Sequence, residues 1–206
     1  MDIEKGVIFA IENVKQAITC EEFADAILIE RFDIPLIDEI IDTVSIPVIA
    51  SCKKGHFIEA KILEKMNVSI IDESIESDIG YMNKRDFSVP FICMVENEED
   101  ANKRIEEGAK FIRTPWGEIG NVMKLVKNIK NIPVIASLKF ASPHDIAMIF
   151  QSGGYASIIS SSVFHSPNPP KLLKSLSDAS KYYNDIDKIF EITKEVGNIL
   201  RSETNI

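Results

Sequence analysis

The residues of this chain best suited to chemistry follow short apolar segments. Asp72 ends the segment 69–72, and Arg113 lies in the segment 111–114. An aspartate that emerges from an apolar segment is costly to bury alone, so we expect Arg113 to be its partner. Such a pair can be purely structural, or it can orient an anionic substrate.

Three lysines that also follow apolar segments are candidate amine nucleophiles. Lys53 and Lys54 follow one apolar segment, and Lys139 follows another. A lysine forms a Schiff base with a sugar carbonyl when burial or crowding lowers its pKa. Adjacent lysines beside Gly55 are more typical of an exposed turn, and His56 is more typical of a surface position in the first turn of a helix. The sequence favours exposed lysines, with imine chemistry as the alternative.

The elements that must position these residues alternate along the chain. Short apolar, β-branched segments recur, and a charged stretch with helical spacing follows nearly every one. This alternation is typical of a parallel sheet covered by helices, and eight such units predict an α/β fold of the (β/α)8 TIM barrel type. The expected strands are 7–11, 25–29, 47–51, 69–72, 91–95, 111–114, 133–137 and 156–160, and the expected helices are 13–23, 35–44, 55–66, 98–107, 119–129, 143–151, 170–183 and 186–200.

The chain length favours a single domain. The 206 residues lie at the short end of the range for this fold, so we expect one barrel over residues 1–206 with a C-terminal helical extension from about residue 186. In such a barrel the chemistry lies at the C-terminal ends of the strands. Glu30 and Arg31 follow the second strand; a surface ion pair is favoured for them, and a place in the barrel mouth is the alternative.

The composition excludes several classes of protein. A hydrophobic share of 45% and a charged share of 27% exclude a disordered chain. The net charge is −9 and the basic residues are scattered, so we expect no nucleic-acid partner. No apolar run approaches the ~18 residues that cross a membrane. Cys20, Cys52 and Cys93 lack zinc spacing, so we expect reduced thiols, no metal and a cytoplasmic location.

Several motifs along nearly the whole chain resemble one family. The combination of Gly-His-x-x-Glu-Ala at 55–60 and Ile-Asp-Glu-Ser at 71–74 is specific. By these motifs the chain resembles the PdxS/SNZ family, the synthase (lyase) subunit of pyridoxal 5′-phosphate synthase, as a shortened and divergent member. The resemblance implies a barrel of the ribulose-phosphate-binding type. Further stretches that carry it are 6–8, 44–48, 83–84, 89–93, 104–109, 113–114, 141–143 and 164–169.

The resemblance implies chemistry whose essential groups are replaced in this chain. In the family, ribose 5-phosphate forms an imine with one lysine, a second lysine takes over the intermediate, and an aspartate is also essential. The matching positions hold Ala10 for the aspartate, and Ser51 and Pro115 for the two lysines. A methyl group cannot shuttle protons, and neither serine nor proline offers a side-chain amine. We therefore expect no catalytic residues and favour a protein without enzymatic activity.

The phosphate-binding loops implied by the resemblance also differ. The glycines that the family has after the seventh strand are replaced within residues 138–140, and those after the eighth within residues 160–162. Each added side chain stands where a phosphate oxygen would approach the backbone. We expect a residual pocket that holds no cofactor and is formed by Asp72, Arg113, Gly117, Gly120, Ser160 and Ser161.

Two segments of the family pattern have no counterpart in this sequence. One is an N-terminal helix resembling a glutaminase-docking element, and the other is a helical insertion that helps to join two hexameric rings in relatives. We therefore expect no glutaminase partner and no assembly larger than a hexameric ring, formed by this chain alone or with an active subunit.

The leading hypothesis is a non-catalytic paralogue that assembles with, stabilises or regulates an active synthase subunit in vitamin B6 biosynthesis. Oligomer surfaces of a barrel lie on its helices, so partner binding can outlast the active site. The alternative is an enzyme with altered chemistry on a phosphosugar or another small anion, in which Lys53, Lys54 or Lys139 replaces the lost lysines.

Overall fold

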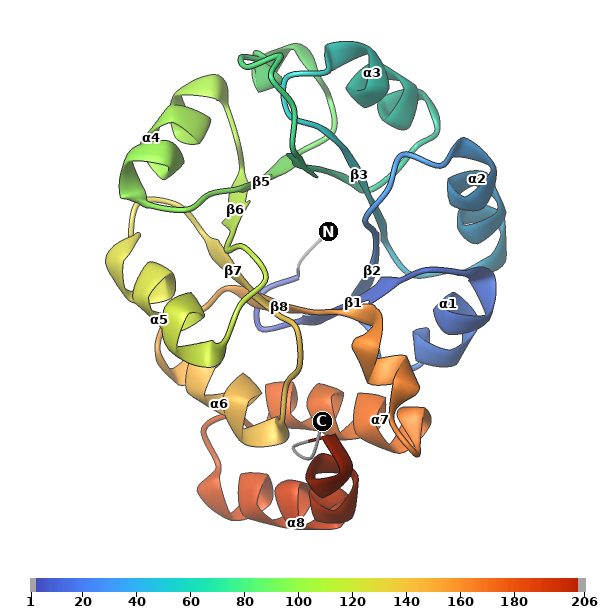
Figure 1. Cartoon of the computed structure of the whole chain (residues 1–206), viewed down its shortest axis with the longest axis vertical. Helices are drawn as coiled ribbons and strands as arrows, with labels where there is room; N and C mark the ends of the chain where they lie inside the picture. Colours follow the sequence, from blue (N-terminus) through green and yellow to red (C-terminus); the bar gives the residue numbers. More distant parts are fainter. Residues whose placement is uncertain (1–2, 204–206) are drawn as a thin grey trace.

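A computed structural model, which describes residues 3–203, shows a closed barrel of parallel strands (Figure 1). Each strand pairs with the next along the chain, and β8 pairs with β1. The (β/α)8 TIM barrel predicted from the sequence is therefore confirmed. The strands are β1 (Val7–Ile11), β2 (Ala26–Ile29), β3 (Val48–Lys53), β4 (Ile70–Ile75), β5 (Phe91–Met94), β6 (Phe111–Arg113), β7 (Val134–Leu138) and β8 (Ala156–Ile159).

Helices surround the barrel, and the last helix, α8, packs against α6 and α7 at one side (Figure 1). The link from β4 to β5 carries only the short 3-10 helix η1 (Lys84–Asp86), as its lack of a helical pattern predicts, and a second 3-10 helix, η2 (Ser161–His165), follows β8. The α-helices are α1 (Val14–Cys20), α2 (Ile34–Thr43), α3 (Phe57–Lys65), α4 (Glu98–Glu107), α5 (Ile119–Asn128), α6 (Pro143–Gln151), α7 (Pro169–Lys181) and α8 (Ile186–Glu203).

The hydrophobic core has two layers, because successive residues of a strand face opposite sides of the sheet. The outer layer lies between the strands and the helices and holds most of the buried apolar side chains. The inner layer fills the barrel itself, so the barrel is a packed core and not a pore. Its fully buried members include Ile8, Ala10, Leu28, Ile49, Ile70, Ile92, Ile135 and Ile158.

Strands β3 and β4 run further than the sequence predicts. Their pairing continues past Ser51 and Asp72 to the pair Lys53 and Ile75, with an irregularity in register after Cys52. The predicted ends at residues 51 and 72 are therefore too early. The apolar pattern stops there, but the backbone ladder continues because the polar side chains that follow are also buried.

The Gly-His-x-x-Glu-Ala motif builds the turn into α3. Gly55 has a left-handed φ of 75°, and a Cβ atom there would lie 2.7 Å from the carbonyl oxygen of Gly80. His56 is the N-cap residue, and its Nδ1 accepts a hydrogen bond from the Glu59 N–H at 3.2 Å. The Glu59 carboxylate accepts from the Lys53 N–H at 2.9 Å. The sequence predicts His56 in the first turn of the helix, but His56 lies just before that turn as the N-cap residue. These contacts give the motif a structural role.

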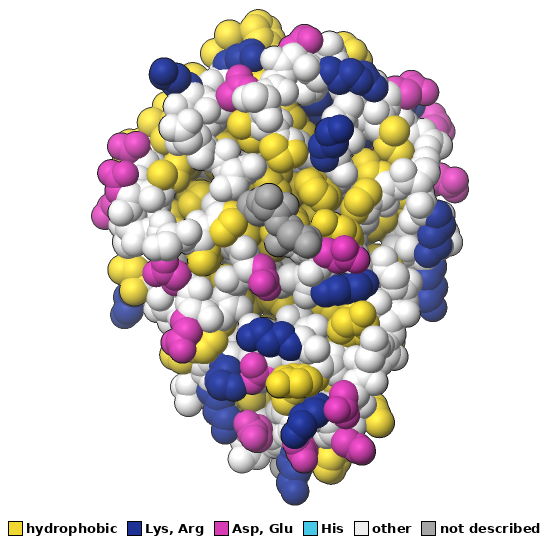
Figure 2. All heavy atoms as spheres, turned by 180° about the vertical axis from the view of Figure 1, so that it is seen from behind, with side chains coloured by type: hydrophobic (Ala, Val, Ile, Leu, Met, Phe, Trp, Pro, Cys, Tyr) yellow, Lys and Arg dark blue, Asp and Glu magenta, His cyan; other side chains and the backbone are white. Residues whose placement is uncertain are grey.

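The surface and the cysteines are unremarkable for a globular chain. Within residues 3–203, no helix combines the length and apolarity needed to span a bilayer. Figure 2 shows acidic, basic and apolar side chains interspersed on the face opposite to that of Figure 1. Cys20, Cys52 and Cys93 are buried and form no disulfide, and burial raises the pKa of the Cys20 thiol to about 12. Such thiols are poor nucleophiles.

Replacing Gly55 by alanine is expected to lower the free energy of unfolding by about 1–3 kcal/mol, because the backbone is left-handed and the added Cβ meets Gly80. Urea denaturation followed by circular dichroism measures the change. Gly197→Ala in α8 is the control, since a Cβ there meets no atom within 4 Å. This control should be stabilised by about 0.5–1 kcal/mol. Equal effects of the two changes would contradict the assignment.

Candidate functional site

A polar layer lies above the apolar inner core, at the C-terminal ends of the strands. It is formed by inward-facing side chains of β3, β4, β6 and β7, which follow inward-facing apolar residues of the same strands. All of these side chains are at least nine-tenths buried. We call this layer the bowl; it consists of Ser51, Asp72, Ser74, Arg113 and Ser137.

Arg113 and Asp72 form a buried ion pair across the bowl, as the sequence predicts. The Arg113 Nε donates to Asp72 Oδ1 at 3.0 Å, and Nη2 donates to Oδ2 at 3.3 Å. Ser51 and Ser74 donate to the same Oδ2 at 2.7 and 2.5 Å. Protein donors therefore occupy the acceptor positions of Asp72, so this carboxylate is held as an ion-pair partner and has little capacity left for a substrate.

Glu30 also reaches the bowl, which corrects the surface ion pair favoured from the sequence. Its Oε1 accepts from Nη2 of Arg113 at 3.3 Å and from Nε1 of Trp116 at 2.8 Å. Arg31 pairs instead with Asp33 at 3.1 Å. Glu30 and Arg31 are separated because successive residues leaving a strand point to opposite sides.

Trp116 covers one side of the bowl. Its ring packs against the inner core and lies 5.4 Å from the guanidinium carbon of Arg113. Burial raises the pKa of the Glu30 carboxyl above 4.5, although the charge of Arg113 and the hydrogen bond from Trp116 act in the opposite direction. With Glu30 ionised, two carboxylates face one guanidinium. This charge balance disfavours a phosphate group in the bowl.

The three positions that the resemblance associates with catalysis carry neither an amine nor a carboxylate. Ala10 faces the interior as part of the apolar inner core. Ser51 lies in the bowl, where its hydroxyl is bound to Asp72. Pro115 follows β6 and lines a hollow beside the bowl. The methyl, hydroxyl and pyrrolidine groups cannot form an imine.

Two of the three lysines of the alternative hypothesis are held by carboxylates other than Asp72. Lys53 lies 3.6 Å from a Glu59 oxygen on α3, and Lys54 donates to Glu76 at 2.8 Å. Lys53 is half-exposed, but the Lys54 side chain is only 14% exposed because its ion pair holds it against the protein. The exposed position expected for Lys54 is therefore wrong. Lys139 is exposed, and no described residue pairs with its ammonium group.

The hydroxyls of the serines after β8 donate hydrogen bonds to other groups of the protein. Ser160 donates to the backbone carbonyl of Lys139 at 2.5 Å, and Ser161 donates to the Glu12 carboxylate at 2.7 Å. A phosphate at this rim would meet serine hydroxyls that already donate to other groups, and the negative charge of Glu12. The arrangement supports the expectation that these serines do not replace the glycines of a phosphate loop.

The two glycines of the expected pocket lie at the start of α5. Gly117 forms a backbone bridge to Leu138 and lines the hollow that Pro115 also lines. Gly120 is exposed, and a Cβ there would meet no atom within 4 Å. Only Gly117 therefore occupies a position where a ligand could contact the backbone within this hollow.

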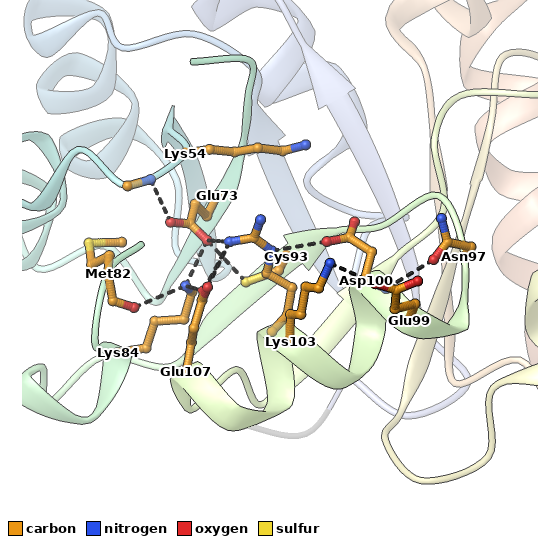
Figure 3. Close-up of polar contacts among 12 residues, drawn as sticks. Lys54, Glu73, Met82, Lys84, Cys93, Asn97, Glu99, Asp100, Lys103 and Glu107 are labelled. Carbon is orange, nitrogen blue, oxygen red and sulfur yellow. Dashed lines mark hydrogen bonds and ion pairs between the residues drawn. The ribbon is translucent and has the colours of Figure 1, made fainter. Parts of the chain in front are cut away.

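A second buried charge cluster lies on the outer face of β4 (Figure 3). Glu73 follows Asp72 but points the opposite way, and accepts from the Gly55 N–H at 2.8 Å. Lys84 lies between Glu73 at 2.8 Å and Glu107 at 2.5 Å, with its ammonium fully buried. Burial acts to lower the pKa of Lys84, but the neighbouring carboxylates outweigh it and raise the pKa above 10.5. Lys84 is thus a structural cation and not an imine-forming amine.

Sequence reasoning did not identify Trp116, Ser137 or Lys84 as members of these clusters. The alternation of strand residues could have found Ser137, because it lies two positions after the inward-facing Ile135. Trp116 lies in a loop and Lys84 begins the short 3-10 helix η1, and neither segment is long enough to show a periodic pattern. Within residues 3–203, no group of three His, Cys, Asp or Glu side chains is arranged to hold a metal ion.

Comparison with known proteins gives the family. The model described as the SOR/SNZ family matches residues 6–152. The chain belongs to the SOR/SNZ family. The "Pyridoxal 5'-phosphate synthase subunit PdxS" of Bacillus cereus (strain B4264) is 28% identical, over 95% of this chain and 87% of the relative. The same values hold for the proteins of that name from Bacillus anthracis (strain A0248) and Bacillus mycoides (strain KBAB4).

The family member described here is shorter than these relatives. The alignment spans 258 positions, more than the 206 residues of this chain, so the relatives carry segments without a counterpart in it. Between the end of α5 at Asn128 and the start of β7 at Val134, only a short turn is present. This turn agrees with the missing insertion inferred from the sequence.

Replacing Arg113 by methionine is expected to lower the free energy of unfolding by about 3–5 kcal/mol, because Asp72 remains buried without its ionic partner. The double variant Asp72→Leu/Arg113→Met removes both charges and should recover most of that loss. Arg31→Met is the control, because its ion pair is exposed and should change stability by less than about 1 kcal/mol. Urea denaturation of the variants makes the comparison; a loss for Arg113→Met as small as that of the control would refute the buried pair.

Trp116 is the sole tryptophan, so its emission reports on Glu30. We expect a pH-dependent change in emission above 4.5, because protonation of Glu30 removes the charge that accepts the indole N–H. Since the folded chain holds this proton more tightly than the unfolded chain, the contribution of Glu30 to stability falls as pH rises through the transition. Glu30→Gln should abolish the transition, and Glu12→Gln should retain it. Persistence of the transition in Glu30→Gln would rule out this origin.

Proposed function

We propose that this chain is a non-catalytic member of the SOR/SNZ family that acts in vitamin B6 biosynthesis by assembling with an active synthase subunit. The observation that carries the proposal is the content of the bowl, where Arg113 is held by Asp72 and Glu30. A guanidinium stays protonated in proteins and does not form the imine with which a pentose would be bound.

The charge of the barrel mouth supports the same conclusion. Asp72 and Glu30 place two carboxylates in and beside the bowl against the one guanidinium of Arg113, and Glu12 adds a third at the rim, where the exposed Lys139 follows β7. A doubly charged phosphate entering this region would be repelled, and the serines that border it already donate to other groups. The mouth is therefore poorly suited to a phosphosugar.

The outer surface supports a role in assembly. Large apolar side chains remain exposed on the helices and on the loop after β4, and clusters of such groups mark protein interaction surfaces. These positions do not depend on the residues of the bowl, so a subunit contact can persist without catalysis. The most exposed are Ile18, Phe57, Ile79, Tyr81, Ile186 and Phe190.

Trapping with borohydride tests the absence of imine chemistry. After incubation with ribose 5-phosphate and borohydride, intact-mass measurement is expected to show no sugar adduct, because none of the side chains that form the bowl is an amine. A PdxS subunit that forms the imine serves as the positive control. An adduct that disappears in Lys53→Gln, Lys54→Gln or Lys139→Gln would replace the proposal by the alternative of altered chemistry.

Native mass spectrometry tests the assembly. When the chain is expressed together with an active PdxS-type subunit of the same host, we expect oligomers that contain both chains at about 10 μM protein, a concentration that detects micromolar affinity. An unrelated TIM barrel of similar size is the control. If only separate assemblies form, the proposed partner is wrong even if borohydride trapping gives no adduct.

A further inference from the structure

A hollow of about 420 Å³ lies beside the bowl, between the segment after β6 and α5. Trp116 separates the two, because its ring packs against the inner core and also lines the hollow. The other apolar contributions come from Pro115, Val122 and Leu125. The volume lies within the range of roughly 300–1,000 Å³ that is typical of small-molecule sites.

Three polar side chains that line this hollow have no partner among the described residues. Glu96 extends from the loop after β5, and Asn121 and Lys124 extend from α5. None of the three side chains makes a hydrogen bond or an ion pair within residues 3–203. All three residues are exposed to solvent, so a carboxylate and an ammonium group border one apolar hollow at its solvent side.

Some exposed lysines on helices pair with a carboxylate three or four positions along the same helix. Lys124, like Lys15 and Lys65, makes no such pair among the described residues. The residues three and four positions from Lys124 are Asn121, Gly120, Lys127 and Asn128, so its own helix offers no acid. The paired cases are Lys61 with Glu64, Lys103 with Glu99, Lys174 with Asp178, and Lys188 with Glu191.

We propose that this hollow binds a small zwitterion with an apolar body, of which an α-amino acid with an aromatic or aliphatic side chain is the simplest example. Glu96 receives the ammonium group, Lys124 and Asn121 receive the carboxylate, and the side chain lies against Trp116. A purely apolar ligand would use neither charge of the hollow, and a phosphate ester would place its charge beside Glu96.

This site is independent of the proposed assembly function. It requires no residue of the bowl, although Trp116, which lines the hollow, also covers one side of the bowl. A ligand that contacts the indole changes the surroundings of the sole tryptophan of the chain. Binding is therefore visible in the emission of the unmodified protein.

Three related probes test the recognition of both charges. L-phenylalanine carries the ammonium group and the carboxylate, N-acetyl-L-phenylalanine lacks the ammonium charge, and 2-phenylethylamine lacks the carboxylate. We expect L-phenylalanine to shift the Trp116 emission in a saturable manner and each analogue to bind about tenfold more weakly, since one charged hydrogen bond is lost. Isothermal titration calorimetry gives the dissociation constants independently.

Conservative variants assign each charge to its residue. Glu96→Gln should weaken binding of L-phenylalanine about tenfold, so that it binds no more tightly than the N-acetyl analogue. Lys124→Gln should also weaken binding of L-phenylalanine about tenfold, so that it binds no more tightly than 2-phenylethylamine. Glu98→Gln and Lys127→Gln are matched controls at exposed positions outside the hollow, and binding to them should be unchanged. No saturable signal up to about 20 mM, or equal binding of the three probes, would overturn the proposal. Unchanged affinity in both Glu96→Gln and Lys124→Gln would do so as well.

Discussion

The buried guanidinium of Arg113 is the constraint on which the barrel mouth depends. A charge with 2% of its side chain exposed is tolerated only if it is paired and its donors are satisfied. Asp72 and Glu30 supply the opposite charge, and Ser137 accepts a further hydrogen bond. These partners come from three different regions of the chain, so the pair also fixes how β2, β4, β6 and β7 meet at their C-terminal ends.

Two adjacent residues of strand β4 place charged side chains on its opposite faces. Asp72 points into the bowl, whereas Glu73 points outward to Lys84 and so ties the loop before β5 to α4 and the turn before α3. The Ile-Asp-Glu-Ser motif therefore serves two buried clusters at once. Such a motif can persist for structural reasons in a chain whose reactive amines have been replaced.

The fold and half of the bowl could be predicted, and the reasons are physical. The alternation of apolar segments with helical stretches fixes the barrel, and the cost of burying Asp72 alone points to Arg113 as its partner. The sequence favours a surface position for Glu30 because its neighbour Arg31 offers an apparent partner, although Glu30 lies two positions after the inward-facing Leu28. Trp116 comes from a loop and Lys84 from the short 3-10 helix η1 in the link from β4 to β5, and the paths of these links depend on tertiary contacts that no local pattern reports.

The contact between Gly55 and Gly80 joins two loops that are distant in the sequence. The Gly55 N–H is bound to Glu73, which is bound in turn to Lys84 at the far end of the loop that carries Gly80. Neither loop can open without breaking interactions of the other. We therefore expect this side of the barrel rim to unfold locally as one unit, with backbone amides of both loops exchanging with solvent together.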